Sequence, residues 1–594
     1  MSRIRAFAAR GGGTLGPFLG LNESQDGESA LKRGEAAVME NWRVTPSGSL
    51  SLRPGTELVC ALPGKITALW HGSLPAGERT VAAANGKLWS INEDTGTAAE
   101  IGSADSARVS FFGFAGKLYI LAGTDYLGWE GDESVPAASV AGYVPLVAVS
   151  APPAGGGTPL EGVNRLTGSK RMRFSPDGAA QTFQLPEKNI DSVDAVLSVT
   201  GGQLPEYTVN LATGRVVFQS VPSEGTNTVE IAWTKGEGER ASVAAMRFSE
   251  SYSGDTDARI FLCGDGSNRC VYSDLDSNGR PSAEYFPELN VLDVDSANTP
   301  VTGLIRHYDS LLVFKPDGCF KVSYGQIAGS NGELIAAFYV RGVNRQTGLD
   351  SPGAVRLADN APVTLCRGGI YLWKTGGSSV PDERNAVFIS ERARASAAAL
   401  GRGVVAEDNA AEREMHFISG RNDLIWNYGR DCFYRYCYSF SVASACLSGD
   451  ALLLGGADGG LRRVSSSAVT DCGEKYPAVW ESGAISFAGE EFRQRTGELF
   501  LSLKPEPGAL LDVALLTDQR ADLPVKRVTF TLAGFLHADF AGWSFRTSRR
   551  ARVRRVKIRT GEHSYLKLRV TTPGGAPCTL LAAVVPSRAS GHMR

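Results

Sequence analysis

Three oxygen-bearing side chains in the middle of the chain have the spacing of a calcium loop. Asp274, Asp276 and Asn278 stand at positions 1, 3 and 5 of such a loop, and Gly279 stands at position 6, where the loop turns sharply. Position 12, however, is Tyr285 instead of the bidentate Glu that completes the ligand set. Because Asn-Gly is also a strong hairpin signal, an ordinary turn is the favoured interpretation, and calcium is the weak alternative.

No other arrangement of residues indicates catalysis. The sequence lacks the G-x-S-x-G, H-E-x-x-H, Walker A and G-x-G-x-x-G patterns that mark common catalytic and nucleotide-binding sites. Its six histidines are scattered, and none has a second His or a Cys at metal-ligand spacing. We therefore expect a protein that is not an enzyme and that needs no cofactor.

The strongest local charge is a basic region at the end of the chain. Residues 541–594 hold twelve Lys and Arg against a single acid, Glu562, which gives a local net charge of +11. Five of these residues are the candidate basic stripe, which we expect to face DNA or another subunit: Arg552, Arg554, Arg555, Lys557 and Arg559.

The two-residue period of a β-strand determines which of these side chains share a face. Alternate residues share a face, so Arg555, Lys557 and Arg559 should point one way and Val556 and Ile558 the other. Three interpretations remain open for the basic face: a solvated surface, a contact with an acidic neighbouring subunit, or a contact with passing nucleic acid.

Length and composition place these residues in a large folded protein. The 594 residues are 43% hydrophobic and 21% charged, which is typical of several globular domains. The formal net charge of −2 argues against one basic nucleic-acid-binding surface over the whole molecule. The ten cysteines include no C-x-x-C pair and are expected to be reduced and mostly buried. No apolar stretch is long enough to span a membrane, and the first residues lack a signal-peptide core, so we expect neither a membrane span nor export.

The pattern of turns predicts an all-β fold. Gly and Pro punctuate short runs rich in Val, Ile, Leu and aromatic residues, and the best helical candidate, Glu391 to Leu400, is short. The run Asn85–Trp89 recurs as Ala115–Tyr119, each a turn followed by a strand. Such repeats favour an irregular β-propeller of about seven or eight blades, and hairpins of an ordinary β-sandwich are the alternative.

Composition shifts divide the chain into five segments. We expect an N-terminal arm (1–55), first propeller blades (56–150), an inserted small β-sandwich (151–235), the remaining blades (236–485) and a C-terminal basic β-sandwich (486–594). The Gly-rich stretch Gly11–Gly13 suggests an arm that threads onto a neighbouring subunit.

Several stretches resemble the tail and head-completion proteins of bacteriophages. At the N-terminus these are Gly20–Asn22, Leu31–Ala36, Glu40–Arg43 and Gly48–Gly55, which ends in Arg-Pro-Gly. The run from Tyr285 to Lys315 and the strands of the inserted segment are similar to such proteins as well. The resemblance covers roughly the first 315 residues, and the last third of the chain has no recognised counterpart.

The family that this resemblance indicates is the tail nozzle, or tail tubular, family of short-tailed phages. The resemblance implies a structural subunit of a ring, usually a hexamer, in the virion tail, assembled in the bacterial host cytoplasm. Its implied partners are other copies of itself, the phage adaptor, the tail fibre proteins and the double-stranded DNA that passes through the lumen. The implied role is to extend the DNA channel below the portal and adaptor, to retain packaged DNA and to anchor fibres.

Two other functions stay open from the residues alone. A receptor- or glycan-binding tail propeller would use aromatic side chains as stacking platforms for sugars, with Trp373, Trp426 and Tyr434 as candidates, although such residues are more often blade core. A secreted hydrolase is disfavoured because neither a signal peptide nor a catalytic triad is recognisable.

Overall fold

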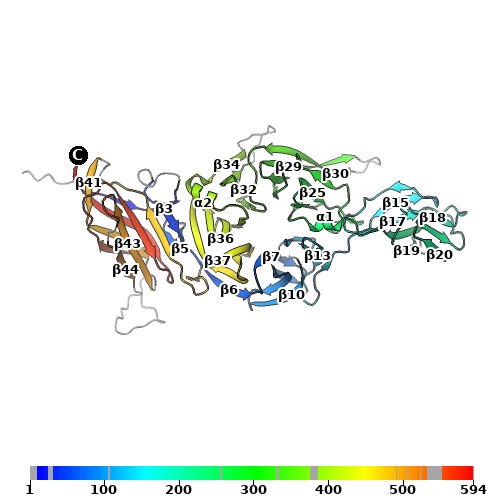
Figure 1. The fold of residues 1–594 in the computed structure, drawn as a ribbon, viewed down its shortest axis with the longest axis horizontal. Coiled ribbons are helices and arrows are strands. Elements are labelled where there is room, and N and C mark those ends of the chain that lie inside the picture. Colours follow the sequence, from blue (N-terminus) through cyan, green and yellow to red (C-terminus); the bar gives the residue numbers. More distant parts are fainter. Residues whose placement is uncertain are drawn as a thin grey trace, which may run out of the picture.

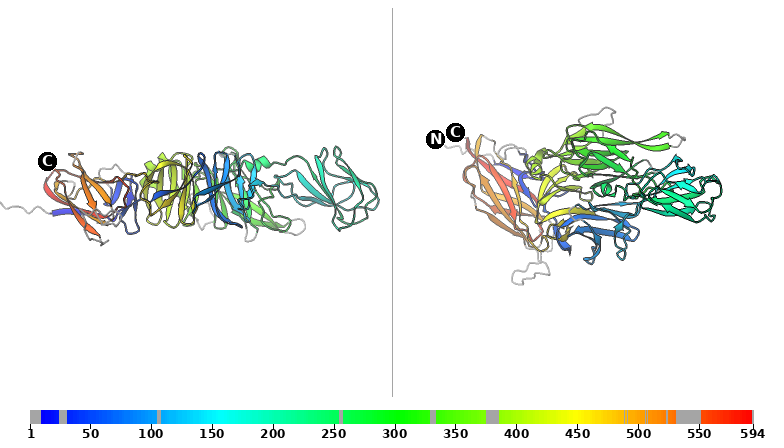
Figure 2. Two further views of the ribbon diagram at one scale, coloured as in Figure 1. Left: turned by 90° about the horizontal axis from the view of Figure 1, so that it is seen from below. Right: turned by 45° about the vertical axis from the view of Figure 1, so that its right-hand side comes forward.

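The chain forms a central β-propeller with a smaller β-sandwich on each of two opposite sides (Figure 1). Figure 2 shows the three parts in a row from two further directions. The structure, a computed structural model, describes residues 10–23, 31–104, 108–253, 257–328, 334–374, 385–487, 489, 491–504, 506, 508–521, 524–530 and 551–592.

Five sheets of four antiparallel strands form five consecutive blades, and in each sheet the strands pair in chain order. Blade one consists of β7 (Ile66–Leu74), β8 (Gly77–Ala84), β9 (Lys87–Asn92) and β10 (Thr97–Ser103), and blade two of β11 (Ser110–Phe114), β12 (Lys117–Leu121), β13 (Tyr126–Trp129) and β14 (Ala138–Ser139). Blade three consists of β23 (Phe248–Tyr252), β24 (Arg259–Cys263), β25 (Arg269–Tyr272) and β26 (Val291–Asp293). Blade four consists of β27 (Gly303–His307), β28 (Ser310–Lys315), β29 (Gly318–Ala328) and β30 (Leu334–Asn344), and blade five of β31 (Val355–Ala358), β32 (Ala361–Cys366), β33 (Gly369–Trp373) and β34 (Ala386–Phe388).

Blades six and seven share one long strand, β37 (Cys432–Ser448). Its first half pairs with β36 (Glu414–Asn427), which pairs with β35 (Val405–Asn409), and its second half pairs with β38 (Ala451–Gly456). The outer strands of blade seven are β39 (Gly460–Ser465) and β6 (Gly55–Ala61). Because β6 precedes blade one in the sequence, this pairing joins the two ends of the ring.

Contacts between neighbouring blades close the ring. The strand β37 lies against β7, β7 against β11, β23 against β27, β27 against β31, and β31 against β35. Blades two and three meet through a shared apolar core that includes Tyr126, Leu262 and Val243 of the short helix α1 (Arg240–Ala244). The fold is therefore an all-β propeller with seven blades, and the alternative of hairpins in one ordinary sandwich is wrong.

The inserted sandwich leaves the propeller between blades two and three. One sheet contains β16 (Thr158–Pro159), β15 (Leu146–Ala151), β17 (Ser169–Phe174), β22 (Val229–Thr234) and β19 (Ser192–Ser198). The other contains β18 (Thr182–Gln184), β21 (Arg215–Phe218) and β20 (Tyr207–Asn210). Alternate side chains such as Phe174, Phe183 and Trp233 fill the space between the sheets. The module begins at β15, ahead of the expected boundary at residue 151.

The C-terminal sandwich is built from both ends of the chain. Its first sheet contains β1 (Arg10–Leu15), β4 (Trp42–Val44), β5 (Leu50–Leu52), β41 (Phe492–Thr496), β42 (Glu498–Lys504), β45 (Arg552–Lys557) and β47 (Thr579–His592). Its second sheet contains β44 (Lys526–Phe530), β43 (Ala509–Thr517), β46 (Leu566–Thr572), β40 (Ala478–Ser482), β3 (Glu35–Glu40) and β2 (Gly20–Leu21), and it continues into blade six through the pair Glu40 and Arg435. Because β40 pairs with β46, the sandwich begins before the expected boundary at residue 486.

The N-terminal segment is an integral part of this sandwich. Strand β1, which contains Gly11–Gly13, pairs along its whole length with β47 of the same chain. The expectation of an arm that threads onto a neighbouring subunit is therefore wrong for the described residues. Glycine allows close approach here, since a Cβ atom on Gly13 would lie 2.4 Å from the Phe487 ring.

Helices are few and short in the described part of the chain. The predicted helical stretch near Glu391 is a 3₁₀ turn, η2 (Ser390–Ala393), followed by α2 (Arg394–Ala399). None of the described helices has the length and apolar character needed to cross a membrane. All ten cysteines are free thiols, and eight of them are buried, as expected.

Candidate functional site

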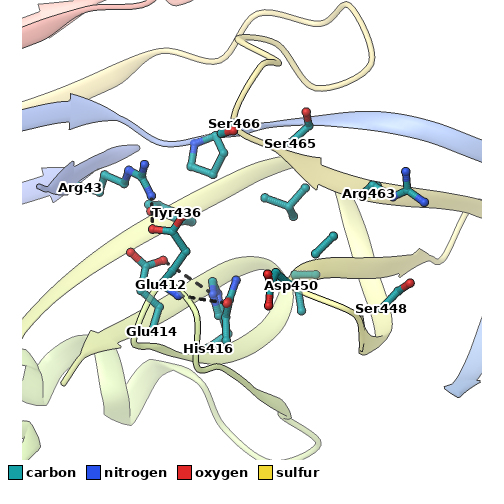
Figure 3. A pocket seen from close by; sticks show the side chains of 15 residues that line it. Arg43, Glu412, Glu414, His416, Tyr436, Ser448, Asp450, Arg463, Ser465 and Ser466 are labelled. Carbon is teal, nitrogen blue, oxygen red and sulfur yellow. Dashed lines mark hydrogen bonds and ion pairs between the residues drawn. The ribbon is translucent and has the colours of Figure 1, made fainter. Parts of the chain in front are cut away.

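A polar cavity of about 560 Å³ lies between the strands of blades six and seven (Figure 3). Its walls come from β36, β37, β38 and β39, from the turns between them, and from β4 of the N-terminal segment. Six charged side chains line it: Arg43, Glu412, Glu414, His416, Asp450 and Arg463. This is a different place in the fold from the basic stripe and from the calcium-like loop.

Two carboxylates surround the buried His416 ring. Its Nδ1 atom lies 2.8 Å from Asp423 Oδ2, and its Nε2 atom lies 3.8 Å from Glu414 Oε2. Burial opposes the charged form of this ring, but the two carboxylates outweigh that effect and raise the pKa of His416. The two carboxylates therefore favour the protonated form of the ring.

Glu414 and Asp423 are themselves held by tyrosines of β37. The Tyr434 hydroxyl donates a 2.5 Å hydrogen bond to Glu414 Oε1, and the Tyr438 hydroxyl donates one of 3.1 Å to Asp423 Oδ2. These tyrosines alternate along the strand, so the period of two puts them on one face. Burial raises the pKa of Glu414. The arrangement is a rigid polar network, which stabilises the blade and shapes the cavity wall.

A second buried network fixes the segment that precedes β6. Arg53 and Asp471 form a salt bridge of 2.6 Å, and both side chains are fully buried. The Arg53 guanidinium also donates to Asn41 Oδ1, Pro54 O and Cys437 O. It stacks on the ring of Tyr476 at 3.7 Å from the centroid. Arg53 therefore links the N-terminal segment, blade six and the loop after β39.

The structure splits the candidate basic stripe between two faces. Strand β45 pairs with β42 so that Arg555 lies opposite Phe500 and Arg554 lies opposite Leu501, and opposite residues share a face of the sheet. Since Leu501 is buried, Arg554 and Arg552 belong to the opposite face from Arg555 and Lys557. As expected, Val556 and Ile558 are buried, and Arg555, Lys557 and Arg559 are exposed. The five candidate residues therefore do not share one face, and the expectation that they meet DNA or another subunit stays a prediction.

The outward face of this sheet gains basic residues from other strands. Arg495 of β41 lies opposite Arg588 of β47, and both are exposed. We call the following residues the basic outer face: Arg493, Arg495, Arg555, Lys557, Arg559 and Arg588. Glu562 pairs with Arg495 at 2.6 Å, and Glu498 pairs with Arg555 at 2.5 Å, so its charge is partly neutralised. Arg546, Arg549, Arg550 and Arg594 of the basic region lie outside the described residues.

The calcium-like loop is an ordinary turn. Asp276 accepts hydrogen bonds from the backbone N–H groups of Asn278 and Arg280, and these bonds lower its pKa. Asp274 is engaged by Arg259 at 2.9 Å, so a second ligand position is already used. The described residues contain no group of three or more His, Cys, Asp or Glu side chains placed to hold a metal ion.

The aromatic residues considered as sugar platforms belong to the core. Trp373 is 2% exposed, Trp426 is 6% exposed and Tyr434 is fully buried. Trp373 donates to Thr364 Oγ1 at 2.9 Å, and Trp426 stacks on Phe433. A platform needs an open ring face, so the role proposed for these three residues is wrong.

The cavity was missed because its residues come from distant parts of the sequence. Arg43 and Arg463 approach the same space only after β6 closes the ring. One local signal existed: Glu414 and His416 are ionisable residues at alternate positions of the buried first part of β36, where Met415, Phe417 and Ile418 are apolar. On a buried strand such residues must have partners inside the protein.

The comparisons with known proteins find similar solved structures but no related sequences. No protein-family model matches the chain, and a search of curated proteins gives no match. Solved structures that are similar include the Dos1 propeller (10% identity, TM-score 0.35, covering 71% of this chain and 96% of that one) and BamB from Moraxella catarrhalis (9%, 0.32, 71% and 95%). The computationally designed Ika8 protein is another (11%, 0.30, 69% and 99%). At these TM-scores the similarity supports no conclusion about function.

Proposed function

We propose that this chain is a structural subunit of the tail nozzle of a short-tailed phage. Copies of it form a ring, a hexamer in this proposal, that continues the DNA channel below the portal and adaptor. The ring retains packaged DNA and anchors tail fibres, and it belongs to the virion.

One observation carries the proposal. The N-terminal stretch that resembles phage proteins supplies β2 to β5 to the C-terminal sandwich and leads directly into β6 of the propeller. It thereby connects the two domains, with Arg53 buried at the junction. A channel wall that resists the pressure of packaged DNA needs stiff subunits, and the closed propeller leaves few free strand edges.

Two further features support the same role. The buried networks around His416 and Arg53 are engaged within the blades, which suits a load-bearing protein. The basic outer face offers a surface for a neighbouring subunit or for DNA, and its partial neutralisation suits a contact that must release DNA on ejection.

DNA retention tests this role directly. Filled phage heads assembled with portal and adaptor, with and without the purified chain, are treated with nuclease, and the DNA that remains inside is measured. The proposal predicts that the chain protects the packaged DNA. Equal loss of DNA with and without the chain would contradict it.

A further inference from the structure

The cavity between blades six and seven is not explained by a ring-forming role. It is lined by three acids, Glu412, Glu414 and Asp450, and by three bases, Arg43, His416 and Arg463. Figure 3 shows Arg43, Glu412, Glu414 and His416 close together, with Asp450 beside them and Arg463 farther away, where it pairs with Glu93 at 2.5 Å. Since the signs balance, the cavity favours neither an anion nor a cation.

Several polar atoms of the wall lack a partner inside the protein. The Tyr436 side chain is 2% exposed and lines the cavity, yet its hydroxyl has no hydrogen-bond partner among the described residues. The Nε atoms of Arg43 and Arg463 are also buried and have no hydrogen-bond partner among the described residues. Buried polar groups in proteins are nearly always hydrogen-bonded, so the unpaired Tyr436 hydroxyl in the cavity wall favours an occupant that carries polar groups.

The wall also has an apolar part. Pro54, Leu452 and Val464 line the cavity beside the polar groups. A molecule that fits both parts must carry hydroxyl groups on its edge and C–H groups on a face.

We propose that this cavity binds a neutral saccharide unit. Each sugar hydroxyl is both a donor and an acceptor, so it matches a wall where carboxylates alternate with guanidinium groups. The Asp450 carboxylate and the Glu412 oxygen that Arg43 does not engage would accept hydrogen bonds from sugar hydroxyls. Arg463, which pairs with Glu93, would donate through its remaining N–H groups. The volume of about 560 Å³ lies within the range of small-ligand pockets. The inference is independent of ring formation.

Saturation-transfer NMR on the full-length chain tests it, with glucose, galactose, N-acetylglucosamine and rhamnose as neutral probes. Inorganic phosphate and spermidine are the charged probes. We expect at least one neutral sugar to bind with a Kd of about 1 mM or below. Asp450→Ala should weaken this binding about tenfold, because Asp450 lies on an exposed turn of the wall and its carboxylate would accept a sugar hydroxyl.

Two further variants keep the test decisive. Ser466→Trp places a bulky ring in the cavity from a loop, and it should abolish binding without breaking a buried network. Glu78→Ala removes an exposed carboxylate at the start of β8 on blade one and should leave binding unchanged. The inference fails if no neutral sugar binds, which would leave water as the occupant. It also fails if only phosphate or spermidine binds, or if sugar binding survives Ser466→Trp. Particle mass measured on the same samples separates this result from the ring proposal.

Discussion

Arg53 and Asp471, which are 418 residues apart in the sequence, form a fully buried, bidentate salt bridge. Arg53 stands in the Arg-Pro-Gly turn just before β6, and Asp471 follows β39, the strand with which β6 pairs. Asn41, Pro54 and Cys437 accept the remaining N–H groups of the guanidinium. The pair therefore fixes the strand that closes the propeller.

Removing one partner of this pair should strongly destabilise the protein. Arg53→Ala leaves Asp471 buried without its counter-charge, which typically costs about 3–5 kcal/mol of the free energy of unfolding. The measurement is denaturant unfolding followed by tryptophan fluorescence. Arg269→Ala is the matched control, because its pair with Asp293 is 63% exposed on both sides and contributes about 0–1 kcal/mol. Equal losses in the two variants would show that the buried pair does not secure the ring.

Stability should fall as the pH rises, and the cause lies in blade six. The pKa of His416 is raised in the folded state, so its contribution is complete below about pH 6.5 and is lost as the pH rises through the higher folded value. Burial raises the pKa of Asp408 to about 6, which adds a decline of the same sign at lower pH. Thermal unfolding midpoints across this range measure the effect.

Single His→Gln variants separate the contributions. His416→Gln should flatten the decline above about pH 6.5, because no cation is left to lose. Burial lowers the pKa of His307, a shift of the opposite sign, so His307→Gln should keep the decline. A His416→Gln protein with the full pH dependence of the wild type would refute the assignment.

Charge reversal on the basic outer face should leave the fold intact and change either DNA binding or the formation of the particle. Arg555 and Lys557 are exposed, so Arg555→Glu with Lys557→Glu should alter stability by no more than about 1 kcal/mol. If the face meets DNA, the salt dependence of DNA binding should fall by about one unit of slope per lost phosphate contact. If it meets a neighbouring subunit, the particle mass should change instead. Arg269→Glu is the control. If the double variant changes neither the salt dependence of DNA binding nor the particle mass, the basic outer face is a solvated surface.

Truncation of Trp426 should act on stability. The ring is 6% exposed and packs on Tyr428 and Phe433, so Trp426→Ala should cost about 3–5 kcal/mol of the free energy of unfolding. Denaturant unfolding and sugar binding are measured on the same sample. If Trp426→Ala abolishes sugar binding without changing the unfolding midpoint, Trp426 is a stacking platform for the sugar after all.

The fold class was readable from local patterns, whereas the closure of the ring was not. Turns such as Asn85-Gly86 and Ala115-Gly116 have the positive φ angles that tight turns need, and strands follow both. They occupy different places in their blades, however, since the first joins β8 to β9 and the second joins β11 to β12. Their spacing is therefore not a blade repeat.

Long-range pairing explains the errors in the domain boundaries and in the site. No local pattern indicates that Gly11–Gly13 pairs with Pro586 and its neighbours, or that β40 pairs with β46. The alternation around Val556 was predictable because it depends on the strand alone. The contribution of Arg495 to the same face was not, because it depends on which strands become neighbours.

The oligomeric state of the purified full-length chain tests the central proposal most directly. Mass photometry at micromolar concentration, alone and with portal and adaptor proteins, should reveal a closed particle near six times the 63.0-kDa mass of one chain. Averaged electron micrographs of that particle should contain an axial opening that admits a DNA duplex. A single 63.0-kDa species under every condition would contradict the proposal that this chain builds a ring.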